Sequence, residues 1–498
     1  MPQAVRDFVD DCLQRHPVVL ATELLSFLYA KTHDPDYFVG LARLLERTED
    51  DSAAFNSLLW NLNRHIFTDR AILGPDVVRR VRYDHQAPCY FRVLSRLAAS
   101  LSPSQPKPTA QTPRVVIVSH VVLAAHHSPS RMCLDFAAHL TRLNVPTLVV
   151  NTNTLPRTSD PHFHNPFVSN FNHNLNDLQQ ATHANASFHL YSNQDPILSN
   201  QKLDACVRAA EAFNPTLILS QGEFNIVGDL LAKRFPTVCL PTARTEPISA
   251  AHVYIDFAGY YDQLEIVRHG LLNHEPMVRQ LPPLLEVAPA TRTFSRAAYG
   301  LKDDQFVFAV VGNRLKHDID KRFEQVLLDL LRQANQCVVF FVGSTGLSWQ
   351  SDKLLAFKGR LFFTTQEPDL TGLYTICDAF LNPNRSGGGN SAVIAVHAGL
   401  PILTLPRCDV AGVIGDENAL ENDAKLVAAA VSLANDPEDQ AAWRRRIDTI
   451  RKKQTDHAKT IKRLLEIGDE AQQRFEQTQP TVCVKPTDAP ATPAANRD

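Results

Sequence analysis

Apolar side chains recur at three- and four-residue spacing through the first hundred residues. Phe8, Cys12, Leu20, Leu24 and Leu28 follow this spacing, and few segments alternate as strands do. The spacing is typical of helices that bury one face. We therefore predict an all-helical domain over residues 1–101.

The pattern stops at residues 102–113, SPSQPKPTAQTP, which hold four prolines and no large apolar side chain. Proline removes a backbone donor and fixes the backbone, so this segment cannot continue a helix or enter a sheet. We predict a linker here.

Short apolar runs rich in β-branched residues then alternate with segments of helical length. Such runs are typical of buried parallel strands, and their alternation with helices indicates an α/β fold. We predict two successive Rossmann-like units, over residues 114–288 and 289–476, joined near residues 281–290. Residues 477–498 are rich in Pro, Thr and Ala and are predicted to be a disordered tail. The expected strands begin at Val115, Thr147, Thr216, Thr237, Val307, Cys337, Arg360, Ala379 and Pro401.

The composition mainly excludes certain partners and certain kinds of site. The formal net charge of −3 gives no general attraction to nucleic acid or to an anionic membrane. The first residues include acids, and no apolar run approaches the ~18 residues of a membrane span, so we expect a cytoplasmic protein without a transmembrane segment. The nine cysteines are scattered without a Cys-x-x-Cys pair, which favours a reducing compartment and gives no cysteine zinc site.

The segment from Leu381 to Pro401 reads as strand, glycine loop, helix and strand. Gly387, Gly388 and Gly389 would let the backbone approach a ligand closely, and the free N–H groups of the next helix could bind a diphosphate. The side chains of Ser386, Asn390 and Ser391 would add donors. The alternative is a flexible loop capped by Ser391.

A second candidate segment follows the first strand of the C-terminal unit. Gly312 ends that strand, and Arg314 and Lys316 come where ligands bind in open α/β sheets. Two cations there could neutralise a departing diphosphate, although a solvated loop would look the same. Asp318 and Asp320 form an Asp-x-Asp pair, which we assign to a helix N-terminus rather than to a metal site.

Histidines cluster after the first strand of the middle unit. His120, His126 and His127 would lie at its carboxyl end, and histidine is the side chain best suited to proton transfer near neutral pH. Solvated loop histidines are the alternative. A later Asn-rich stretch is predicted to be a surface loop rather than a metal site. Its histidines are His162, His164, His173, His183 and His189.

Three further polar residues follow strands of the middle unit and are expected to face the cleft. Glu223 lies in SQGEFN, and Arg244 and Glu246 lie in PTARTEP. We consider them candidates for binding the acceptor.

Together these segments resemble glycosyltransferases of the GT-B fold, in particular the group of O-GlcNAc transferases and bacterial cytoplasmic protein N-glycosyltransferases. The segment from His127 to Ser130 is similar to a His-containing motif of that group, and Lys316 matches a lysine that touches the UDP diphosphate. Residues 385–391, which include Arg385, and the Ala-Gly-x-Pro motif at 398–401 complete the resemblance. It implies two facing Rossmann-like domains with the donor held by the C-terminal one.

The chain departs from the GT-B pattern at one position. Many GT-B enzymes carry a ribose-binding acid five residues before the glycine of Ala-Gly-x-Pro, and this chain has Ile394 there. We therefore expect Asp416 and Glu417 to supply the ribose contacts. The missing acid also counts against the large retaining family with paired glutamates, and the resemblance implies inversion at the anomeric carbon.

The expected function is transfer of a hexose or N-acetylhexosamine from a UDP-sugar to a protein side chain. The expected partners are a nucleotide sugar and a protein acceptor, with a second copy of the chain as a further candidate. No nucleic acid, no metal and no other cofactor is expected. Two alternatives stay open at this point. One is a non-hydrolysing UDP-sugar 2-epimerase, and the other is a non-catalytic GT-B accessory subunit.

Overall fold

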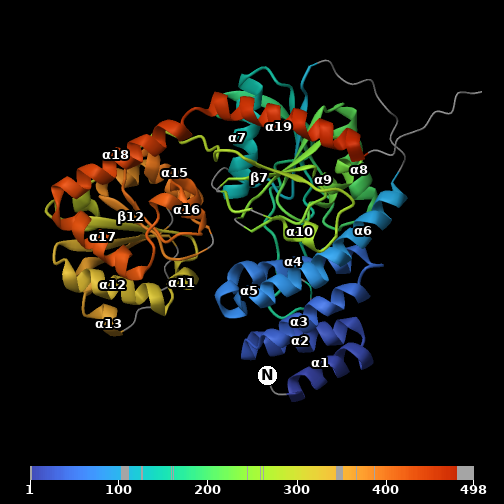
Figure 1. Ribbon diagram of the computed structural model, residues 1–498, viewed down its shortest axis with the longest axis horizontal. Coiled ribbons are helices and arrows are strands. Elements are labelled where there is room, and N and C mark those ends of the chain that lie inside the picture. Colours follow the sequence, from blue (N-terminus) through green and yellow to red (C-terminus); the bar gives the residue numbers. More distant parts are fainter. Residues whose placement is uncertain are drawn as a thin grey trace, which may run out of the picture.

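The computed structural model contains three bodies: a helical domain and two α/β domains (Figure 1). It describes residues 3–101, 112–124, 127–158, 160, 162–243, 245–257, 259–261, 263–343, 352–365, 367–385 and 387–478. His126, Arg244 and Ser386 lie outside the described residues, as do most of the predicted linker and all but two residues of the predicted tail.

The first hundred residues are helical, as predicted. Asp34 and Asp51 begin two of the helices by accepting backbone N–H groups with their side chains. Cys12 is fully buried, whereas Phe8 is 40% and Leu20 39% exposed, so the predicted burial of these two positions was wrong. The elements are α1 (Gln3–Arg15), α2 (Val18–Thr32), α3 (Pro35–Arg43), η1 (Leu44–Arg47), α4 (Ser52–Thr68), α5 (Arg70–Arg80), η2 (Val81–Gln86) and α6 (Ala87–Ser100).

The middle domain is built on an eight-stranded sheet with the order β3-β4-β2-β1-β5-β6-β7-β8. Every neighbouring pair is parallel except β3 and β4. Helices cover the sheet, and its central strands are buried along their whole length. The elements are β1 (Val115–Ser119), α7 (Ser128–Arg142), β2 (Thr147–Asn151), β3 (Asp177–His183), β4 (Ala186–Ser192), α8 (Asn200–Ala212), β5 (Leu217–Gln221), α9 (Ile226–Ala232), β6 (Thr237–Leu240), β7 (Val253–Asp256), α10 (Glu265–Arg268) and β8 (Met277–Gln280).

Part of the Asn-rich stretch is a hairpin rather than a loop. His183 ends β3 and His189 lies in β4, so the loop prediction was wrong for these two histidines. The edge strand β3 has mostly polar, solvent-facing residues, so its sequence lacks the apolar pattern that predicts a buried strand. His183 Nε2 lies 2.5 Å from Asp135 Oδ1 and so ties the hairpin to α7.

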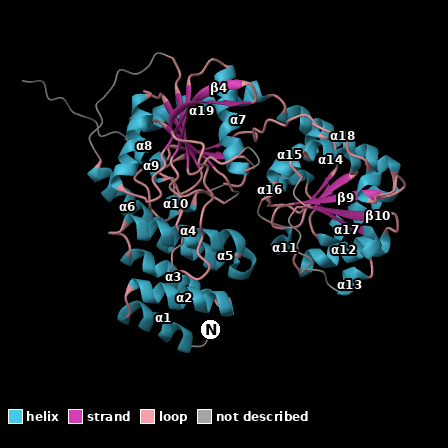
Figure 2. Ribbon diagram, turned by 180° about the vertical axis from the view of Figure 1, so that it is seen from behind, coloured by secondary structure: helices cyan, strands magenta, loops and turns pink. Residues whose placement is uncertain are grey.

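The C-terminal domain has a fully parallel sheet in the order β11-β10-β9-β12-β13 (Figure 2). Asp320 begins α12 by accepting the N–H of Phe323 at 2.8 Å, which is the helix N-terminus predicted for it. Asp318 is instead the last residue of α11, so the prediction was wrong for this residue. The elements are η3 (Arg296–Tyr299), β9 (Phe306–Val311), α11 (Leu315–Asp318), α12 (Lys321–Gln333), β10 (Cys337–Val342), α13 (Asp352–Leu355), η5 (Lys358–Arg360), β11 (Leu361–Thr364), α14 (Leu370–Leu373), η6 (Tyr374–Ile376), β12 (Ala379–Leu381), α15 (Gly389–His397), β13 (Ile402–Leu403), α16 (Asp409–Ile414), η7 (Asp416–Asn418), α17 (Asp423–Asn435) and α18 (Pro437–Gln454).

The last helix, α19 (His457–Thr478), leaves the C-terminal domain and packs on the middle domain (Figure 1). Ile461, Leu464 and Ile467 are fully buried in the core that contains β1 and α7. A Cβ on Gly468 would lie 2.8 Å from Leu217 Cδ2, so the helix approaches β5 closely. The chain therefore crosses between the two α/β domains twice, which the expected domain of residues 289–476 did not anticipate.

The apolar character of the helices and the state of the cysteines follow from the described residues. None of their helices is long and apolar enough to cross a membrane. Their eight cysteines are all buried and unpaired, in agreement with the prediction of reduced core cysteines.

Candidate functional site

The ends of the two sheets and the helical domain enclose three adjoining cavities. A cavity of about 300 Å³ lies between the two α/β domains. A second, of about 430 Å³, lies between the helical and middle domains, and a third, of about 710 Å³, touches all three domains. Phe67, near the end of α4, lines all three cavities. The helical domain is thus part of the cleft.

The glycine loop forms one wall of the 300 Å³ cavity through Gly387, Gly388, Gly389 and Asn390. Gly387 and Gly388 have backbone φ values of 96° and 88°, which residues other than glycine rarely adopt. Gly388 is the N-cap of α15, so the first N–H groups of that helix lie at the loop. Such a helix start favours a bound anion.

Asp409 holds the loop from the neighbouring helix. It is the first residue of α16, and its Oδ2 accepts the N–H of Gly387 at 2.6 Å. Asp409 also lines the 300 Å³ cavity. Ser391 lies one residue beyond the loop residues of the cavity wall, and its carbonyl accepts the hydroxyl of Tyr374 at 3.0 Å.

Arg385 lies beneath the loop, and its guanidinium binds other groups of the protein. Its side chain is 4% exposed and pairs with Asp318 at 2.9 Å, and it also donates to Asn382 Oδ1 and to the carbonyl of Val311. A Cβ on Gly312 would lie 2.0 Å from Arg385 Nη1, so a side chain at this strand end would displace the guanidinium of Arg385. In this arrangement Arg385 and Gly312 position the loop from behind.

The two cations predicted to bind the diphosphate, Arg314 and Lys316, differ in their surroundings. The guanidinium of Arg314 sits over the ring of Phe67 at 4.4 Å, and its Nη2 would be 3.7 Å from a Cβ on Gly387. Arg314 is therefore beside the glycine loop. Lys316 is exposed on α11, which lies on the side of the C-terminal domain toward the helical domain (Figure 1).

His120 and His127 both line the 430 Å³ cavity. His120 is buried, with Nε2 2.9 Å from the carbonyl of Glu223 and Nδ1 3.2 Å from Thr154 Oγ1. Burial lowers the pKa of His120 to about 4, so its ring is neutral and donates its one N–H to the Glu223 carbonyl. His127 is only half-buried, at the N-terminus of α7, with Nδ1 2.7 Å from Ser130 Oγ.

The two described acids among the acceptor candidates have structural partners. Glu223 forms an ion pair with Arg82 of the helical domain at 2.6 Å, with side chains 15% and 3% exposed. Both carboxylate oxygens of Glu246 accept N–H groups at the start of α10. Burial raises the pKa of Glu246, although these N–H groups and Arg82 oppose the rise. Glu223 still lines the 430 Å³ cavity, and Glu246 lines the 710 Å³ cavity.

Asp416 and Glu417 lie behind the cavity wall rather than in it. Asp416 Oδ1 accepts the hydroxyl of Tyr260 at 2.9 Å and the N–H of Arg407 at 3.0 Å, and so joins the two α/β domains. Glu417 is exposed on η7. Ile394 is buried in the core of the C-terminal domain.

Sequence reasoning missed Phe67, Tyr260 and Asp409, which all line the 300 Å³ cavity. Asp409 carried a local signal, because it follows a strand and begins a helix, as residues of a ligand-binding edge do. Phe67 and Tyr260 come from segments whose local pattern gives no such signal. Only the docking of the domains brings them to the cleft.

The arrangement can hold an anion at the glycine loop, with N–H groups and the cation of Arg314 around it. The volume of the adjoining cavity is at the lower end of small-ligand sites, about 300–1,000 Å³. Among the described residues, the one group of three side chains able to hold a metal lies elsewhere, at His139, Glu286 and His457.

No protein-family model and no curated protein matches the chain. Among solved structures it is similar to a mutant of the Thermobaculum terrenum O-GlcNAc transferase, with a TM-score of 0.52 and 15% identity over 92% of this chain and 91% of that one. A glycosyltransferase from Rickettsia africae matches with a TM-score of 0.50 and 11% identity, over 73% of this chain and 99% of that one. The fold is GT-B, preceded by a helical domain, as the sequence motifs predicted.

Proposed function

We propose that this protein is a glycosyltransferase that moves a hexose or N-acetylhexosamine from a UDP-sugar to a protein acceptor. The observation that carries the proposal is the glycine loop with Arg314 beside it, at a cavity between the two domains of a GT-B fold. An O-GlcNAc transferase among the similar structures supports the class of reaction.

Glycosyl transfer breaks the bond between the anomeric carbon and the diphosphate through a state with oxocarbenium character. The protein must therefore stabilise the negative charge that develops on the diphosphate. In the proposed mechanism the N–H groups at the start of α15 and the cations of Arg314 and Lys316 do this. No metal is required, because the cations neutralise the leaving group.

The acceptor would approach from the 430 Å³ cavity, on the side of the helical domain. Of the two described histidines there, we assign proton removal to His127. His120 is a poor base because its N–H is bound to the Glu223 carbonyl and burial has lowered its pKa to about 4. Attack from this side, opposite the diphosphate, would invert the anomeric carbon.

We assign the ribose to Asp409 in place of Asp416 and Glu417. Asp409 and Asp256 both line the 300 Å³ cavity, and Asp409 is the one bonded to the glycine loop. A carboxylate can accept hydrogen bonds from ribose hydroxyls.

The test is to incubate the purified protein with a panel of UDP- and GDP-sugars and a cell lysate, and to identify modified proteins by mass spectrometry. We expect transfer from a UDP-sugar to protein after EDTA treatment. Lys316→Ala should lower kcat at least about 100-fold, as loss of a group that stabilises developing charge does. Lys353→Ala, which removes an exposed lysine on α13, is the matched control.

The outcomes separate the alternatives. A requirement for added Mn²⁺ would refute the metal-free mechanism. Conversion of the UDP-sugar to its epimer without acceptor would identify an epimerase. Full function of the Lys316→Ala variant would indicate a non-catalytic accessory subunit, and a sugar found only on glycans or lipids would exclude the protein acceptor. Size-exclusion chromatography tests the possible homodimer.

A further inference from the structure

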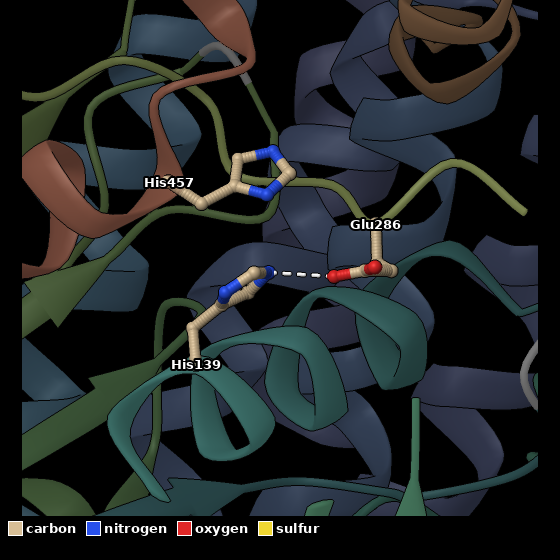
Figure 3. A group of neighbouring side chains, drawn as sticks. All are labelled: His139, Glu286 and His457. Atoms are coloured by element: carbon tan, nitrogen blue, oxygen red, sulfur yellow. Dashed lines mark ion pairs between the residues drawn. The ribbon is translucent and has the colours of Figure 1, made fainter. Parts of the chain in front are cut away.

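Two histidines and a glutamate converge where the chain crosses between the α/β domains (Figure 3). His139 is in the last turn of α7, Glu286 is in the connection that follows β8, and His457 is the first residue of α19. One potential ligand atom from each lies within 4.8 Å of the other two. The three residues come from three separate segments, so the fold alone brings them together.

One of the three groups, His457, has a ring nitrogen without a partner among the described residues. His457 Nε2 is buried and has no hydrogen-bond partner, and the ring of His457 stands edge-on to that of His139 with centroids 4.5 Å apart. His139 Nε2 lies 2.8 Å from Glu286 Oε2. Because buried polar atoms are normally paired, the unpaired nitrogen of His457 indicates a missing partner at this point.

The protonation states suit a cation. Burial lowers the pKa of His139, and the neighbouring His457 lowers it further, which favours the neutral ring that a metal binds. Burial alone would raise the pKa of Glu286, but the hydrogen bond and charge of Arg142 hold it below its usual value. The set therefore offers two imidazoles and one carboxylate.

We propose that His139, Glu286 and His457 form a Zn²⁺ site that clamps the crossing between the two α/β domains. Two imidazoles and one carboxylate are a zinc ligand set, with water in the fourth position. On binding, Zn²⁺ would take the place of the proton on His139 Nε2 that faces Glu286, and the ring would stay neutral by carrying its one proton on Nδ1.

Arg142 is the charge that opposes a metal here. Its Nη1 lies 2.8 Å from Glu286 Oε2 and 3.3 and 3.4 Å from the two ring nitrogens of His139, and its Nη2 donates to the carbonyl of Ala184. Glu286 has two carboxylate oxygens, so one can stay with Arg142 while the other binds the metal. Arg142 then keeps the carboxylate ionised and oriented.

The clamp is separate from the proposed donor site. Met132 lines the 300 Å³ cavity, and His139 follows it by seven residues, about 10 Å along the helix. None of the three ligands is among the described residues that line that cavity. The site would hold α7, the interdomain connection and α19 together without taking part in sugar transfer.

The test is a zinc titration of the full chain, stripped with a chelator, in competition with a chromophoric zinc indicator. We expect one Zn²⁺ per chain, and a Kd weakened at least about 100-fold in His457→Asn, because loss of even an outer-shell partner costs 10–100-fold. Zn²⁺ should raise the Tm of the wild type but not of this variant. His189→Asn, which changes a histidine on β4, is the control and should bind zinc as the wild type does.

Glu286→Gln provides a second test that keeps the shape of the side chain, in case His457→Asn folds poorly. The wild type failing to bind one equivalent, or the wild type and both variants binding with equal affinity, would overturn the proposal. Sugar transfer should not depend on zinc. A chain that binds zinc but transfers no sugar would refute the proposed function alone.

Discussion

Arg385 shows how one buried cation can shape a loop of glycines. It pairs with Asp318, reaches the end of β9, and sits close enough to Gly388 that a Cβ there would lie 2.8 Å from its Nη2. The sequence predicted that this arginine binds the ligand, whereas in the structure Arg385 donates its hydrogen bonds to other groups of the protein. A local pattern reveals the type of a side chain but not the direction in which it points.

His120 allows a prediction about pH at the residue scale. Its pKa is about 4 in the folded protein, because it is buried, against about 6.5 in the unfolded chain. Below pH 6.5 the unfolded chain therefore binds a proton that the folded chain does not. The stability of the fold should be full above pH 6.5 and fall as the pH drops toward 4, by about 2 kcal/mol at pH 5 from this group.

Urea denaturation at pH 7 and pH 5 measures this effect when the wild type is compared with His120→Asn. The variant should lose about 2 kcal/mol less than the wild type between the two pH values. His252, whose pKa burial lowers to about 3, contributes in both proteins and cancels in the comparison. Equal losses in the two proteins would show that His120 is not held neutral.

At the scale of elements, the glycine loop and α15 act as one unit. Gly388→Ala should lower the free energy of unfolding by about 1–2 kcal/mol, because its φ of 88° is unfavourable for alanine and the Cβ meets Arg385. Donor affinity, measured by calorimetry with UDP, should fall in the same variant.

Gly389→Ala is the matched control for this loop. Gly389 is the first helical residue of α15, and its added Cβ would meet nothing closer than 3.7 Å. The free energy of unfolding of the Gly389→Ala variant should stay within about 1 kcal/mol of the wild-type value or rise slightly. If both variants lose the same stability, the special conformation of Gly388 is not what shapes the loop.

Strands were predictable where burial is complete on both faces. β1, β2, β9 and β10 are continuous apolar runs, and each was expected within one residue of its observed position. β3 is polar and exposed at one edge of its sheet, and β8 is only partly buried at the other edge, so their apolar patterns are too weak to detect.

At the scale of the whole molecule, the helical domain is fastened to the cleft by a buried ion pair. Arg82 reaches Glu223 and also donates to the carbonyl of Glu246 at 2.7 Å. Arg82→Ala should cost about 3–5 kcal/mol, since it leaves a largely buried carboxylate without its partner. Transfer to protein should fall more than donor hydrolysis, because the acceptor side of the cleft loses its support.

Arg96→Ala is the control for this docking. Arg96 pairs with Asp50 at 3.0 Å on the exposed surface of the helical domain, so its loss should cost less than about 1 kcal/mol. Urea denaturation and transfer assays on both variants make the comparison. Similar results for the two variants would contradict a role for the Arg82 pair in holding the domain.

The sequence by itself determined the helical first domain, the nine expected strands and the GT-B class, because helix periodicity and buried apolar runs are local properties of the chain. It also located the glycine loop and the loop histidines. Only the tertiary structure decided that Phe67 and Tyr260 line the cleft, that Arg385 lies behind it, and that α19 returns to the middle domain. These depend on contacts between segments far apart in sequence, and a local pattern carries no information about which distant segments meet.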